Sequence, residues 1–108
     1  MAYDPGIAEI LRDALAGEPI TEKRMFGGIA FMYDGNMVCG VHKNGAMFRV
    51  GKENEPAARA LPGVADMTFT GKPMKSMVDV APETLADEAL LGQLVTLSLG
   101  FVKSLPPK

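Results

Sequence analysis

The chain has 108 residues, 47% of them hydrophobic and 22% charged, which is enough apolar material for one domain with a real core. A formal net charge of −2 and a pI of about 5.3 exclude the basic surplus typical of a dedicated DNA-binding domain. Cys39 is the single cysteine, so no intramolecular disulfide can form, and no apolar run approaches the length of a membrane span. We expect a cytoplasmic protein with no membrane contact and no strong autonomous binding to DNA.

The first predicted element is an amphipathic helix that begins after Asp4. An aspartate there can accept hydrogen bonds from N–H groups of the first turn, and Pro5 suits the first helical position. The apolar residues that follow have the spacing of one helix face: Ile7, Ile10, Leu11, Ala14 and Leu15. Gly17 and Pro19 predict its end, and we expect the apolar face to pack on a sheet.

The segment Arg24-Met25-Phe26-Gly27-Gly28 precedes the strongest β pattern of the chain. Adjacent glycines allow positive φ or a close approach of the backbone to another group. The segment therefore predicts a shaped corner, either architectural or related to a ligand.

Two hairpin turns follow, because Asp34-Gly35 and Asn44-Gly45 both favour two-residue type I′ turns. The pairs expected in this register are Tyr33–Asn36, Met32–Met37 and Phe31–Val38, then Lys43–Ala46, His42–Met47 and Val41–Phe48. The core face would then carry Ala30, Met32, Met37, Cys39, Val41, Phe48 and Val50. The other face would carry Ile29, Phe31, Tyr33, Val38 and Met47 with Asn36, His42 and Arg49. That second face is too apolar for open solvent, so we expect the rest of the chain or a partner to cover half of it. A slip of one residue would exchange the faces.

The second half of the chain predicts a short helix, two strands and a long helix. The helix follows Pro56, the strands span residues 67–70 and 74–80, and the second strand has the charge alternation of a sheet edge. The last helix begins near Pro82 or Asp87, ends near Ser104, and is apolar on more than one side. The fold class is α+β: an antiparallel sheet built on two consecutive hairpins, with an N-terminal and a long C-terminal helix packed on it. We expect a single domain over residues 1–108.

No set of residues typical of catalysis or metal binding accompanies these elements. His42, the only histidine, ends a strand without neighbouring metal ligands, and Cys39 lies on the expected core face, where cysteine acts as a small hydrophobe. Gly27-Gly28 precede a strand, whereas phosphate-binding loops lead into a helix. We therefore expect no catalytic residues, no cofactor and no metal, and predict that the protein is not an enzyme.

Basic residues leave one alternative open. Lys72 lies in a Gly-Lys-Pro turn and Lys75 follows it. If this turn folds back over the sheet, the two could form a cationic pocket with Lys23, Arg24 and Arg49. An arginine fork would suit a carboxylate or phosphate there. In the simpler interpretation the lysines confer solubility and Arg49 pairs with an acidic side chain.

With these residues in view, the sequence resembles the TfoX N-terminal domain family, named for the TfoX/Sxy regulators of natural competence. The motifs that carry the resemblance are residues 23–28, Phe31 with Gly35 and Met37, Gly40-Val41, Arg49-Val50, residues 69–74 and residues 105–108. Together they extend over nearly the whole chain. The resemblance implies an α+β domain of a bacterial cytoplasmic protein linked to transcriptional control.

Competence regulators of this kind carry a second, C-terminal domain, so we expect this chain to be a stand-alone form. The resemblance implies a regulatory interaction module with a protein partner in the transcription machinery, and the apolar surfaces predict a homodimer. The alternative function is that of a small anionic-ligand-binding protein or an unrecognised enzyme. The candidate interaction or anion site comprises Arg24, Phe26, Gly27, Gly28, Arg49 and Lys72.

Overall fold

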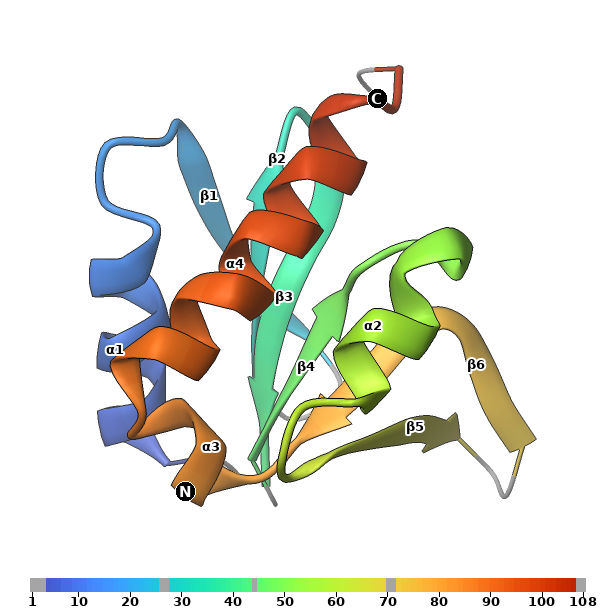
Figure 1. The fold of residues 1–108 in the computed structure, drawn as a ribbon. Helices are drawn as coiled ribbons and strands as arrows, with labels where there is room; N and C mark the ends of the chain where they lie inside the picture. Colours follow the sequence, from blue (N-terminus) through green and yellow to red (C-terminus); the bar gives the residue numbers. More distant parts are fainter. Residues whose placement is uncertain (1–3, 26–27, 44, 70–71, 107–108) are drawn as a thin grey trace.

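The computed structural model describes residues 4–25, 28–43, 45–69 and 72–106, without the side chains of residues 25 and 66–75 (Figure 1). The helical elements are α1 (Pro5–Ala14), a 3₁₀ turn η1 (Lys52–Asn54), α2 (Glu55–Arg59), α3 (Pro82–Leu85) and α4 (Glu88–Lys103). The strands are β1 (Ile20–Met25), β2 (Gly28–Tyr33), β3 (Asn36–His42), β4 (Gly45–Arg49), β5 (Val64–Phe69) and β6 (Lys72–Val80).

All six strands form one antiparallel sheet in the order β1-β2-β3-β4-β6-β5. The predicted α+β class is therefore confirmed. β6 lies between β4 and β5, so its predicted edge position is wrong. Its pairing with β4 joins segments about thirty residues apart, and the alternation of charges within β6 does not indicate such a distant partner. One edge strand is instead β1, a charged segment in which the sequence pattern had indicated no strand.

Local capping fixes where the two main helices begin. The side chain of Asp4 accepts a hydrogen bond from the N–H of Gly6 at 2.8 Å, as its position before Pro5 predicts. The side chain of Asp87 accepts from the N–H groups of Ala89 and Leu90 and starts α4. Both predicted starts of the last helical region are therefore used, with α3 after Ala81 and α4 after Asp87. Among the described residues no helix is long and apolar enough to cross a membrane.

The first hairpin has its predicted turn but a shifted register beyond it. Asp34 and Gly35 both have positive φ, and Met32 pairs with Met37 as expected. Phe31, however, pairs with Cys39 and not with Val38, because the register shifts between Phe31 and Met32. The extra residue on β3 is a β-bulge, and it reverses the alternation of β2 relative to the sequence prediction.

The second hairpin turns one residue earlier than predicted. His42 pairs with Gly45, so Gly45 begins β4 and does not stand in the turn, while Asn44 lies outside the described residues. The predicted pair of His42 with Met47 is wrong. Gly45 is needed for a different reason, because a Cβ there would lie 2.5 Å from the carbonyl oxygen of Val80 on β6.

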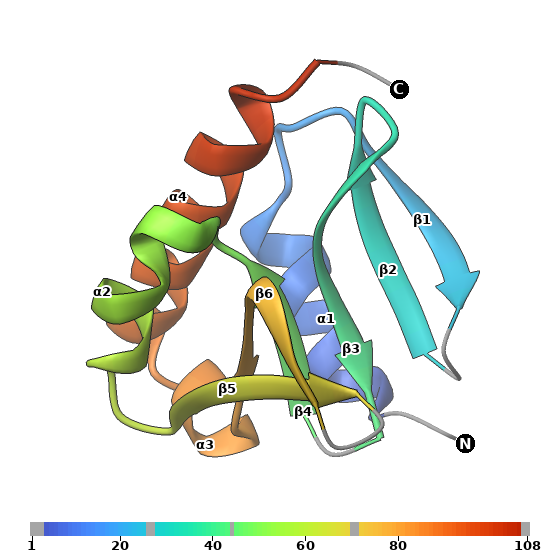
Figure 2. The same ribbon diagram turned by 90° about the vertical axis from the view of Figure 1, so that its right-hand side faces the viewer.

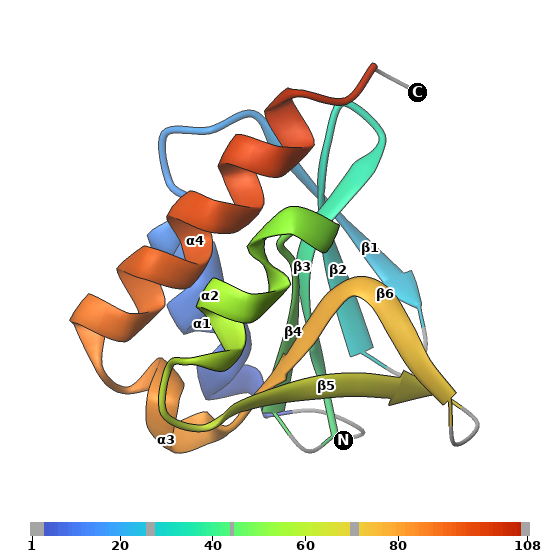
Figure 3. The same cartoon turned by 45° about the vertical axis from the view of Figure 1, so that its right-hand side comes forward.

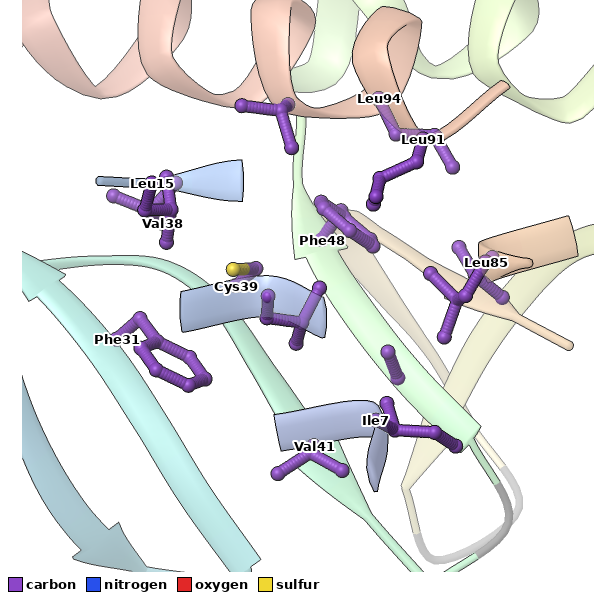
Figure 4. Close-up of a cluster of buried hydrophobic side chains, with 14 of the residues drawn as sticks. Ile7, Leu15, Phe31, Val38, Cys39, Val41, Phe48, Leu85, Leu91 and Leu94 are labelled. Atoms are coloured by element: carbon purple, nitrogen blue, oxygen red, sulfur yellow. The ribbon is translucent and has the colours of Figure 1, made fainter. Parts of the chain in front are cut away.

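One face of the sheet and all four helices enclose the core (Figures 2 and 4). The cluster draws on every helix: Ile7, Leu11 and Leu15 from α1 or just after it, Ala58 from α2, Leu85 from α3, and Leu94 and Val102 from α4. Its sheet side includes Ile29, Phe31, Val38, Cys39, Val41 and Phe48. The predicted placement of Cys39, Val41 and Phe48 is confirmed. The sequence pattern had placed Ile29, Phe31 and Val38 on a second, partly exposed face. This placement is wrong, because the extra residue on β3 reverses which side chains of β2 face the core.

β6 bends sharply at Ser76, whose φ of 72° is unusual for a residue other than glycine (Figure 3). The N–H of Ser76 donates to Oε2 of Glu55 at 3.0 Å, and its carbonyl accepts from the N–H groups of Val50 and Gly51. The irregular pairing of β5 with β6 falls beside this bend. The first residues of β6, including Lys72, thereby leave β4 and pair with β5 alone.

Candidate interaction surface

One face of the sheet carries no described helix, and we call it the open face. A row of paired residues crosses it on all six strands: Lys23, Ala30, Gly40, Met47, Asp79 and Ala65. Ala30, Met47 and Met77 are buried but do not belong to the core cluster on the helical side. The second face is therefore formed in part by other residues than the sequence predicted, with Ala30 in place of Ile29 and Phe31 on β2.

Among the residues whose side chains are described, the accessible apolar residues of the open face lie near the first hairpin turn. Thr21, Met32 and Met37 form a second row there, across β1, β2 and β3. Met32 and Met37 are half-buried, whereas Thr21 is exposed. Methionine side chains are unbranched and polarisable, so they adapt to irregular partner surfaces. This row is the apolar part of the open face best suited to contact another molecule.

A polar pair lies further along the open face. Nε2 of His42 is 2.7 Å from Oδ1 of Asp79, and the contact spans β4, because His42 lies on β3 and Asp79 on β6. The side chain of His42 is 15% exposed and that of Asp79 is 41% exposed. The sequence showed His42 without any acidic partner, since the pair is separated by 37 residues. Only the β4–β6 pairing brings the two together.

The candidate cations of the sequence stand far apart where they are described. Arg24 is exposed on the edge strand β1, whereas Arg49 lies on β4, three strands away, or about 14 Å at the usual strand spacing. The guanidinium carbon of Arg49 lies 5.6 Å from the centroid of the Phe101 ring on α4. Lys72 begins β6, and its side chain lies outside the described residues. The structure therefore does not bring Arg24 and Arg49 together.

The glycine pair is described only at Gly28, since Phe26 and Gly27 lie outside the described residues. Gly28 is buried at the start of β2, and a Cβ there would lie 1.9 Å from the carbonyl oxygen of Val41. No side chain fits at such a distance. The need for glycine at this position comes from close backbone approach, which supports an architectural role.

The thiol of Cys39 is the remaining reactive group considered from the sequence, and it is buried. Cys39 is fully buried, and burial raises the pKa of its thiol well above the ordinary value. The residues that the structure describes contain no group of three or more His, Cys, Asp or Glu side chains placed to hold a metal ion.

A family model gives the chain its relationship to other proteins. The model for the TfoX N-terminal domain matches residues 9–102, from α1 to the last turn of α4. The chain belongs to the TfoX N-terminal domain family. Membership associates this TfoX N-terminal domain with competence regulation. No curated protein and no solved structure matched it.

Proposed function

We propose that this TfoX N-terminal domain is a regulatory interaction module of the bacterial cytoplasm. It contacts a protein of the transcription machinery through its open face and acts by that contact, without catalysis. The observation that carries the proposal is the row of half-buried Met32 and Met37 on a sheet face that has no helix over it among the described residues.

The composition of the surface supports a protein partner over a nucleic acid. Apolar, unbranched side chains give a contact area that is desolvated at little cost, whereas DNA affinity depends on several paired phosphates. The net charge of −2 opposes the binding of DNA phosphates. The two charged residues of the central row also have opposite signs, because Lys23 stands on β1 and Asp79 stands on β6.

The test is photo-crosslinking to purified bacterial RNA polymerase holoenzyme. A benzoylphenylalanine replaces Met37 on the open face or, as a matched control, Gln93, which is exposed on α4. We expect a crosslinked product from position 37 that position 93 does not give. Met32→Glu in the same chain should then remove the product, because a buried charge disfavours the contact.

Equal crosslinking from both positions, or none from position 37, would contradict the proposal. A thermal-shift screen with phosphorylated and carboxylated metabolites tests the alternative function, that of a small anionic-ligand-binding protein. Stabilisation by one such class without any crosslinking would favour an anion-binding protein, since a ligand of the native state raises apparent stability.

A further inference from the structure

The free edge of β1 is a surface that the open-face proposal does not use. β1 pairs with β2 along one side, and no described strand pairs with its other side. Its central residues Thr21, Glu22, Lys23 and Arg24 are all exposed. A strand edge presents unpaired N–H and C=O groups, to which an extended segment can add as a further strand.

The charges on β1 are not equivalent. Glu22 accepts hydrogen bonds from the Arg12 guanidinium at 2.6 and 2.7 Å, and these bonds hold the pKa of Glu22 below its ordinary value. Lys23 and Arg24 have no hydrogen bond or ion pair with any described residue. The uncompensated charge of this edge is therefore positive, although the chain as a whole is acidic.

A cavity of about 260 Å³ lies directly beside β1, between this strand and the end of α1. Its apolar lining includes Leu15, Ile20 and the fully buried Phe31. Its charged wall consists of Arg12, Asp13, Glu18 and Glu22. Arg12 pairs with Glu22, and Lys103 pairs with Glu18. Ile20 and Glu22 come from β1 itself, so a strand added to β1 would place a side chain at this cavity.

Self-association by this edge is disfavoured. In an antiparallel pair related by a twofold axis, the residue at the axis faces its own copy. An axis at position 22 or 24 therefore opposes two glutamates or two arginines, and like charges directly opposite destabilise a sheet. An axis at position 23 opposes two lysines and sets Arg24 opposite Glu22, whose carboxylate is already bonded to Arg12. An axis at Thr21 brings Pro19, which has no N–H, into the pairing region.

We propose that β1 binds an acidic, extended segment of another protein, which adds antiparallel to it as a seventh strand. The added residues opposite Arg24 and Lys23 are acidic, and the next residue, opposite Glu22, is apolar and enters the cavity beside Leu15 and Phe31. In the partner these residues run acidic, acidic, apolar from N- to C-terminus. The proposal deepens the proposed function by naming the chemistry of a protein partner at a separate surface.

The charges make the edge selective. Lysine and arginine on an edge strand discourage neutral or basic strands and further copies of the chain, which is a common protection against aggregation. The same charges leave an acidic strand as the favoured occupant.

The probe is a fluorescein-labelled peptide, Gly-Thr-Val-Glu-Glu-Leu-Thr-Val-Gly, measured by fluorescence anisotropy with the full chain. Its counterpart carries two lysines in place of the glutamates. We expect the acidic peptide to bind about tenfold more tightly, from two opposite-charge pairs gained and two like-charge pairs avoided. The Lys23→Glu/Arg24→Glu variant should reverse this preference, which also shows that the variant is folded. The matched control, Lys43→Glu/Lys52→Glu, removes two exposed lysines away from β1 and should keep the preference.

Methylation of single peptide N–H groups tests the strand geometry. Binding should fall at every second position, since alternate amides point toward β1. Equal binding of both peptides, an equal effect of the control variant, or methylation effects without alternation would each overturn the inference. Met32→Glu on the open face should leave peptide binding unchanged. Peptide binding without polymerase crosslinking would refute only the proposed contact through the open face. Crosslinking without peptide binding would refute only the proposed addition of a strand to β1.

Discussion

Gly28→Ala is the most direct test of how the Arg-Met-Phe-Gly-Gly segment acts. The added Cβ would lie 1.9 Å from the carbonyl oxygen of Val41 and 3.4 Å from the Cα of His42. Backbone atoms surround it, so relief requires β2 to move relative to β3. Overpacking of this kind costs about 1–3 kcal/mol, and a disturbed ladder hydrogen bond adds about 1 kcal/mol. We expect unfolding to require about 2–4 kcal/mol less.

Urea denaturation followed by circular dichroism measures this loss. With an m-value of about 2 kcal/mol/M, the midpoint should fall by roughly 1–2 M. Valine at this position should cost more than alanine. The matched control is Gly92→Ala in α4, where a Cβ meets no atom within 4 Å outside its own helix. That change should stabilise by about 0.5–1 kcal/mol, because alanine favours helices. An unchanged midpoint for Gly28→Ala would refute the close-approach argument and reopen the segment as a binding site.

Four further predictions follow from the buried and charged groups. Cys39 should react with a thiol reagent only on unfolding, since it is fully buried. Because burial raises the pKa of its thiol, the free energy of unfolding should fall above pH 9.0 by up to about 1.4 kcal/mol per pH unit, and Cys39→Ala should remove that slope in urea titrations. Glu22, whose pKa the Arg12 hydrogen bond lowers, should contribute stability that is lost as pH falls below 4.5, and Glu22→Gln should flatten this loss. Gel-shift assays should show no sub-micromolar retardation of random duplex DNA. Light scattering over a dilution series tests the predicted homodimer, now centred on half-buried residues of α4, and Leu97→Asp should dissociate it while the variant stays folded by circular dichroism.

Features encoded by neighbouring residues were predictable. The Asp4 and Asp87 caps, the Asp34-Gly35 turn and the apolar stripe of α1 each depend on interactions within a few residues. The family motifs were readable for the same reason, since they are local strings. They predicted the α+β class and the family, and both are confirmed.

The candidate site could be predicted only in part. Arg24, Gly28 and Arg49 were identified as residues of interest, but whether they converge depends on the order of strands across the sheet. The pair of His42 with Asp79 had no sequence signal, because 37 residues separate the two in the chain. The cavity between α1 and β1 had none either, because its shape depends on how β1 packs beside α1 and Phe31.

Local sequence therefore determined the starts of the two main helices, the first turn and the apolar face of α1. The tertiary structure decided which face of β2 is buried, because a single bulged residue on β3 reverses its alternation. It also decided why Gly28 and Gly45 are glycines, since both face carbonyl oxygens of other strands. Finally, it made β1 an edge strand, although its charged residues carry little β propensity, because backbone pairing with β2 outweighs that weak local preference.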